Sequence, residues 1–118
     1  MSEWSIDEEA LRGRRELATQ AWSALLGDST ACSLAKNGHS YPAAKYHEGR
    51  TVALGELLRT IRALPVRGSQ LAAFSTVRER WVRMAATAEE ADWRSYAAGG
   101  ADALAIGDPA RGLVSGGT

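Results

Sequence analysis

Residues 42–64 read PAAKYHEGRTVALGELLRTIRAL, and this stretch decides the fold class. Its larger apolar residues recur at intervals of three, four or seven, which places them on one face of an α-helix. These residues are Tyr46, Ala53, Leu57, Ile61 and Leu64. Pro42 suits the first turn of a helix, where its missing N–H has no helical partner to lose, and Pro65 ends the run. The spacing therefore predicts a helix over 42–64.

Two glycines lie inside this predicted helix, Gly49 and Gly55. Each lowers the stability of an isolated helix by about 1 kcal/mol relative to alanine. One explanation for their presence is that they permit the close approach of a neighbouring helix.

Three other segments show helical spacing, over about 6–26, 69–88 and 89–106. Ser5 and Glu8 have the form of a capping box before the first of them. The paired glycines Gly99 and Gly100 make the last helix less regular, and a break there is one outcome to test. The connection over 27–41 is rich in small and polar residues and contains the turn signal Asn37-Gly38.

The helix predicted over 69–88 has its apolar residues close to a seven-residue repeat. They are Leu71, Phe74, Val77 or Arg78, Trp81, Met84 or Ala85, and Ala88. This seam, like the glycine-bearing helix over 42–64, can pack either within the chain or against a second copy.

These elements predict an all-α fold, a small antiparallel bundle of three to four helices with a long loop between helices 1 and 2. Residues 1–106 form a single helical domain, and 107–118 are expected to be a flexible C-terminal tail.

The totals exclude several classes of protein. Fourteen basic residues balance fourteen acidic ones, so no overall field draws the chain to nucleic acid or to a membrane. A single cysteine excludes an intrachain disulfide, and no apolar run is long enough to cross a membrane. The acidic N-terminus lacks the features of a signal peptide, so we expect a cytoplasmic protein.

The residues that could ligate a metal lie close together in sequence: Cys32, His39, His47 and Glu48. Their spacing matches no zinc-finger pattern, and no Glu-x-x-His or His-x-x-x-His pair places two ligands on one helical face. We therefore expect no metal and no cofactor, and these four residues are the alternative to test. Cys32 with His39 or His47 would be the thiol-dependent version of that alternative.

Basic residues gather in the middle of the chain. Arg59, Arg62, Arg78, Arg80 and Arg83 are accompanied there by few acids. If their two helices are neighbours, these arginines form one basic surface for an acidic protein partner or for nucleic acid. The other interpretations are an arginine-rich face in contact with water only, or arginines that pair with the acidic N-terminus of a neighbouring subunit.

Three tryptophans, Trp22, Trp81 and Trp93, lie on apolar stripes and are expected in the core. Trp4 precedes the predicted cap, so it either packs back on the first turn as a hydrophobic staple or anchors a partner.

No catalytic motif emerges from these patterns, and catalysis is not expected. The leading hypothesis is a small cytoplasmic helical protein that acts by protein–protein interaction, as a self-associating protein or as an accessory or regulatory subunit, with a homo-oligomer, preferably a dimer, as the expected state. The alternatives are a nucleic-acid-associated regulator that uses the arginine surface and a metal- or thiol-dependent site at Cys32, His39 and His47.

Overall fold

The computed structural model describes residues 4–26, 42–64, 67–105 and 114–116. Within them lie four helices and two short strands. In chain order these are β1 (Trp4–Ile6), α1 (Glu8–Leu26), α3 (Pro42–Arg62), α4 (Arg67–Thr87), α5 (Ala91–Leu104) and β2 (Val114–Gly116). The predicted all-α bundle is confirmed, with each helix boundary within two residues of its expected place. The connection between α1 and α3 lies outside the described residues.

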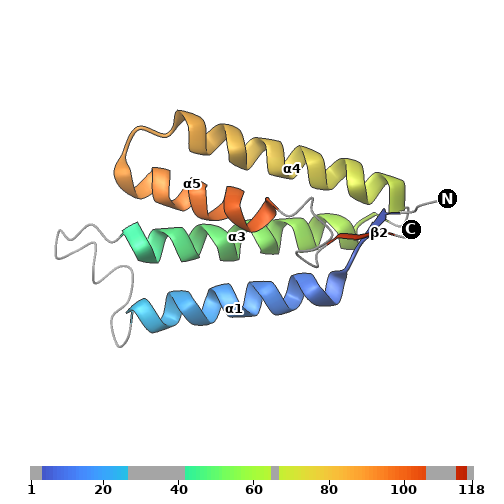
Figure 1. Ribbon diagram of the computed structural model, residues 1–118, viewed down its shortest axis with the longest axis horizontal. Helices are drawn as coiled ribbons and strands as arrows, with labels where there is room; N and C mark the ends of the chain where they lie inside the picture. Colours follow the sequence, from blue (N-terminus) through green and yellow to red (C-terminus); the bar gives the residue numbers. More distant parts are fainter. Residues whose placement is uncertain (1–3, 27–41, 65–66, 106–113, 117–118) are drawn as a thin grey trace.

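Helices that follow one another along the chain run in opposite directions, as predicted (Figure 1). The layers are α4, then α5 and α3, then α1, with α3 in contact with each of the other three helices. The two short strands lie at the same end of the bundle (Figure 1). There β1 and β2 pair antiparallel, with Ser5 opposite Ser115.

This strand pair was not predicted, because each strand has only three residues and shows no alternation long enough to recognise. It lies partly within the segment that we expected to be a tail. The rest of that segment, apart from 114–116, is outside the described residues.

The start of α1 differs from the predicted capping box. Asp7, not Ser5, caps the helix: its Oδ1 accepts the N–H of Ala10 at 3.0 Å. Ser5 instead belongs to β1, so its backbone is extended three residues before the helix begins at Glu8. Glu8 does not take part in a capping box and instead forms ion pairs with Arg12 and Arg62.

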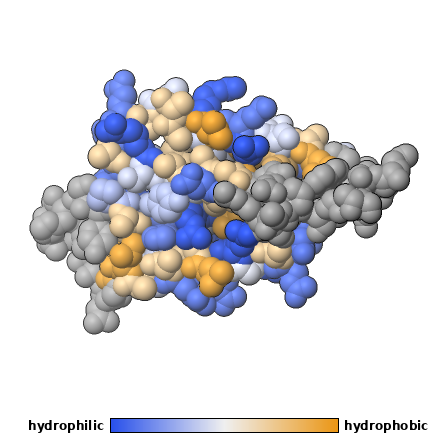
Figure 2. All heavy atoms as spheres, in the orientation of Figure 1, coloured by the Kyte–Doolittle hydropathy of each residue, from blue (hydrophilic) through white to orange (hydrophobic). Residues whose placement is uncertain are grey.

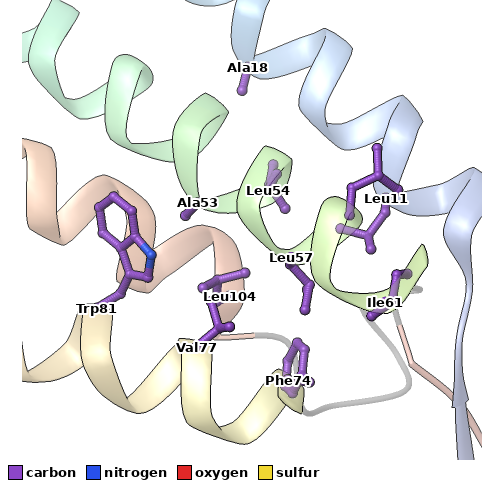
Figure 3. Packing of buried hydrophobic residues seen from close by; sticks show 11 residues of the cluster. Leu11, Ala18, Ala53, Leu54, Leu57, Ile61, Phe74, Val77, Trp81 and Leu104 are labelled. Carbon is purple, nitrogen blue, oxygen red and sulfur yellow. The ribbon is translucent and has the colours of Figure 1, made fainter. Parts of the chain in front are cut away.

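The core is a single cluster of side chains from all four helices (Figure 3). Leu54, Leu57 and Ile61 of α3 lie at its centre, between Leu11 of α1 and Leu104 of α5. Phe74, Val77 and Trp81 close it from α4. Each leucine buried in this way contributes roughly 1.5–3 kcal/mol relative to an exposed one.

The turn from α3 into α4 is held by one polar side chain. The Gln70 amide donates to the carbonyl oxygens of Ile61 at 3.1 Å and Leu64 at 2.9 Å. These carbonyls lie at the end of α3, where the last acceptors of a helix have no N–H four residues further on. The Ile61 carbonyl oxygen also accepts the backbone N–H of Leu64 at 3.1 Å. Gln70 thereby satisfies the end of one helix from the first turn of the next.

The crossing of α3 and α5 depends on glycine. A Cβ at Gly49 would overlap the carbonyl oxygen of Tyr96, and a Cβ at Gly99 would overlap the carbonyl oxygen of Tyr46. Gly100 leaves the space that the Trp81 ring fills. The expected close approach at Gly49 is therefore confirmed. The helix α5 runs unbroken through Gly99 and Gly100, and at both positions a side chain would overlap a neighbouring helix.

Candidate functional site

Two of the four predicted metal ligands lie within the described residues. Cys32 and His39 lie outside the described residues, whereas His47 and Glu48 lie in the second turn of α3. Glu48 pairs with Lys45 at 3.3 Å, and Nη1 of Arg50 lies 2.9 Å from Nδ1 of His47. Within the described ranges, no three potential ligands converge on one point. Convergence of Cys32, His39 and His47 stays a prediction.

His47 is half-buried, and burial lowers its pKa, with a further contribution from the positive charge of Arg50. Since a guanidinium can only donate, the contact with Arg50 uses Nδ1 of His47 as an acceptor. Both facts favour the neutral imidazole at this position.

Two of the five predicted surface arginines bind carboxylates of the chain itself. Nε of Arg62 donates to Oε1 of Glu8 at 2.6 Å, and Arg80 pairs with Oε2 of Glu56. The other oxygen of Glu56 accepts the indole N–H of Trp81 at 2.8 Å, so this carboxylate joins α3 to α4. These pairs reduce the positive charge that the basic surface offers to phosphates.

The remaining predicted arginines divide between two helices. Arg59 is exposed in the last turn of α3. Arg78 and Arg83 are exposed on α4, where they line the same groove of about 550 Å³. The described residues that line it all come from one side of α4, and we call them the outer face of α4: Ser75, Arg78, Glu79, Val82, Arg83 and Ala86.

The outer face of α4 lies away from the predicted heptad seam. Phe74, Val77 and Trp81 of that seam are buried inside the chain, so they are not free to pack on a second copy. Val82 follows Trp81 and is rotated from it by about 100°, the angle between successive residues of an α-helix. Its side chain is 46% exposed. The seam is therefore used by α3 and α5 within the chain, and Val82 on the outer face remains exposed.

The burial of the three tryptophans differs from the prediction. Trp81 is buried as expected and Trp22 is half-buried, but Trp93 is 51% exposed. Its ring packs edge-on against Tyr96 and lies under the ammonium of Lys45, 5.2 Å from the ring centroid. The expectation that Trp93 belongs to the core is wrong, because its side chain in the first turn of α5 is half exposed and packs on Tyr96 and Lys45 instead of the core cluster. The side chain of Trp4 lies outside the described residues.

A second groove, of about 400 Å³, lies between α1 and α3. We call it the arginine groove, and it is lined by Arg12, Arg15, Glu16, Thr19, Leu58 and Arg62. Of these residues the sequence predicted only Arg62 as part of a surface. The one signal for the others is Gly55, since a glycine within a helix indicates that something approaches the backbone closely.

Comparison of the chain with protein-family models, with curated proteins and with solved structures gives no match. None of the described helices is both long and apolar enough to cross a membrane. The functional assignment therefore rests on the geometry of the two grooves.

Proposed function

We propose that this chain acts by protein–protein interaction, as a cytoplasmic protein without catalytic activity, and that it self-associates through the outer face of α4. The observation that carries the proposal is the exposed Val82 at the middle of a groove that runs along one helix. In paired helices charged residues flank the apolar positions and set the choice of partner, and Val82 between Glu79 and Arg83 has this arrangement.

The charges of this face suit a second copy of the chain. Two identical helices pair antiparallel around a two-fold axis, so each residue meets a partner at an equal distance beyond the axis. With the axis at Trp81, Glu79 of each copy lies opposite Arg83 of the other, because both are two positions from the axis. The two Val82 side chains then lie beside the axis, and the small residues Ser75 and Ala86 leave room near the ends.

The expected association is weak. Figure 2 shows one side of the molecule, on which hydrophobic and hydrophilic side chains are interspersed over α4. A single helix pair buries less than the roughly 800 Å² per partner of a standard stable interface. The dissociation constant is therefore expected in the micromolar range, which corresponds to a binding free energy of about −7 to −8 kcal/mol.

Sedimentation velocity over about 5 to 500 µM tests the proposal, because self-association makes the average mass depend on concentration. The wild-type chain is expected to approach a dimer, and Val82→Glu is expected to stay monomeric. Val52 is the matched control, since it is also an exposed valine, at 37%, but lies on α3. A wild-type chain that remains monomeric throughout, or a Val52→Glu effect equal to that of Val82→Glu, overturns the proposal.

A charge swap tests the register. Glu79→Arg alone places like charges opposite each other and is expected to abolish the dimer. Adding Arg83→Glu restores the opposite pairing across the axis and is expected to restore the dimer. The swap keeps the helical spacing but reverses the order of acid and base, which is slightly less favourable within one helix. Circular dichroism should therefore report a melting temperature slightly below that of the wild type, with the same helix content.

The nucleic-acid alternative has its own test on the same samples. An arginine surface that binds phosphates releases counterions, so its affinity falls steeply with added salt. Fluorescence anisotropy with a labelled single strand of about 20 nucleotides at low salt measures this directly. Salt-sensitive binding that Arg78→Gln and Arg83→Gln weaken would favour the nucleic-acid role over self-association.

A further inference from the structure

The arginine groove is a place where α1 and α3 leave a charged side chain between them instead of packing directly. A Cβ at Gly55 would lie only 2.8 Å from Nε of Arg15, so glycine makes room for this guanidinium. The same Nε donates to the carbonyl oxygen of Thr51 at 3.4 Å. Arg15 is therefore placed over the backbone of α3 by one long hydrogen bond.

No carboxylate among the described residues pairs with Arg15. Its guanidinium carries five N–H donors, and the bond to Thr51 uses one of them. The remaining donors lie in a groove whose wall also carries the hydroxyl-bearing Thr19 and whose apolar side is Leu58. Arg15 is therefore a cation in the wall of the groove whose hydrogen-bonding capacity is only partly used.

The other two arginines show which chemistry the groove recognises. Oε1 of Glu8 accepts from Nε of Arg62 at 2.6 Å and from Nη2 of Arg12 at 3.2 Å. The hydrogen bond from Arg62 is the largest reason that the pKa of Glu8 lies below its ordinary value. One carboxylate of the chain is thus already bound between two of the three guanidiniums.

We infer that the arginine groove binds an anion with several carboxylates, one on Arg15 and another that takes the place of Glu8 between Arg12 and Arg62. Guanidinium and carboxylate form paired, charge-assisted hydrogen bonds, which favours this ligand class. Glu16 in the wall adds a negative charge, so the ligand must place its carboxylates on the arginines and away from Glu16. Glu8 acts as a competitor within the chain.

The inference does not depend on self-association, since the outer face of α4 shares no residue with this groove. The ligand has two sources with the same chemistry, a free polycarboxylate or the acidic side chains of a peptide. Citrate and a hexaglutamate peptide are the two probes, with sodium chloride of equal ionic strength as the control for general screening.

Isothermal titration calorimetry gives the affinity, and the side-chain Nε–H signals of arginine in a ¹⁵N spectrum report which arginines respond. Arg15→Gln is expected to weaken binding about tenfold, because the unpaired guanidinium is lost. Glu8→Gln is expected to strengthen binding about threefold, since removal of a competitor raises the fraction of open groove. Arg94→Gln, an exposed arginine of α5 outside both grooves, is expected to change nothing.

The two probes separate the sources: citrate binding points to a small molecule, and binding of hexaglutamate alone points to a peptide. Absence of binding by both, or binding that Arg15→Gln leaves unchanged, overturns the inference. An unchanged affinity in Glu8→Gln refutes the competition, provided that thermal melting shows the variant to be folded.

Discussion

Two contacts of α3 use glycine for opposite purposes. Against α5, Gly49 and Gly99 allow backbone to lie on backbone, and nothing else fits between the helices. Against α1, Gly55 admits the guanidinium of Arg15. The absence of a side chain at these glycines thus closes the contact between α3 and α5, whereas it leaves an accessible groove between α1 and α3.

The helices α3 and α1 also differ in how many of their residues are buried. Nine of the twenty-one residues of α3 are buried, whereas Leu11 and Ala18 are the only buried residues among the nineteen of α1. Leu17 of α1 is 62% exposed. A contact closed by main-chain atoms cannot exchange its contents with solvent, but a contact filled by the end of a long side chain can. The contact between α3 and α5 is therefore the rigid one, and the contact between α1 and α3 is the one that solvent can enter.

Gly99→Ala is expected to have the largest effect on stability, a loss of about 4 kcal/mol or more. The added methyl group would overlap the carbonyl oxygen of Tyr46, which belongs to a helix backbone and cannot move alone. Urea unfolding measures the free-energy change. Gly13→Ala is the matched control, because nothing lies within 4 Å of that position, and it is expected to gain up to about 1 kcal/mol. Equal effects of the two substitutions would show that the α3–α5 contact is not closed by the backbones.

Leu11→Ala is expected to follow, with a loss of about 2–4 kcal/mol, because Leu11 is the larger of the two buried residues of α1. The loss should be local. Hydrogen exchange should quicken in the amides of α1 while those of α5 keep their protection, since α5 packs on the other side of α3. Equal acceleration in both helices would mean that α1 is as firmly coupled to the core as α5.

The sequence was sufficient to predict the helices, but not which groups meet at the contacts between them. Pro42, the apolar spacing of α3 and the acidic start of α1 act locally, and local signals are legible in a single chain. The glycines signalled close approach, and Gly49 fulfilled that prediction. Gly55 shows the same signal and receives a side chain of α1 instead. The spacing of residues along one helix does not specify which group of a neighbouring helix lies opposite each of them.

The predicted site was incomplete for a related reason. Arg62 was found because it belongs to a run of bases, but its neighbours Arg12 and Arg15 lie in a different helix whose charges balance. Their convergence with Arg62 depends on the angle at which α1 crosses α3. The seam of α4 was recognised correctly as apolar, yet only the structure shows that it is used within the chain and leaves Val82 outside.

Gly55→Ala sharpens the comparison because its clash is with a flexible group. The new methyl group would displace the Arg15 guanidinium, whose side chain can swing toward solvent. The steric cost is small and alanine is the better helix former, so stability is expected to change by less than about 1 kcal/mol. The Nε–H signal of Arg15 should shift, and citrate binding should weaken. A loss of stability as large as that of Gly99→Ala would contradict the distinction between the two contacts.

The smallest expected effect is the dependence of stability on pH through His47, which lies on α3 one turn before Thr51, where Arg15 binds. Burial and Arg50 lower the pKa of His47 below 6.5 in the folded chain, so the unfolded chain binds the proton more readily. Stability from this residue is therefore complete above pH 6.5 and is lost as the pH falls through the folded pKa. Because the ring is only half-buried, solvent screening keeps the loss under about 1 kcal/mol. His47→Gln should flatten the corresponding slope in urea unfolding between about pH 7.5 and pH 5.5. An unchanged slope in His47→Gln would mean that the imidazole is as well solvated in the folded chain as in the unfolded one, and that the open character of α1–α3 extends a full turn further along α3.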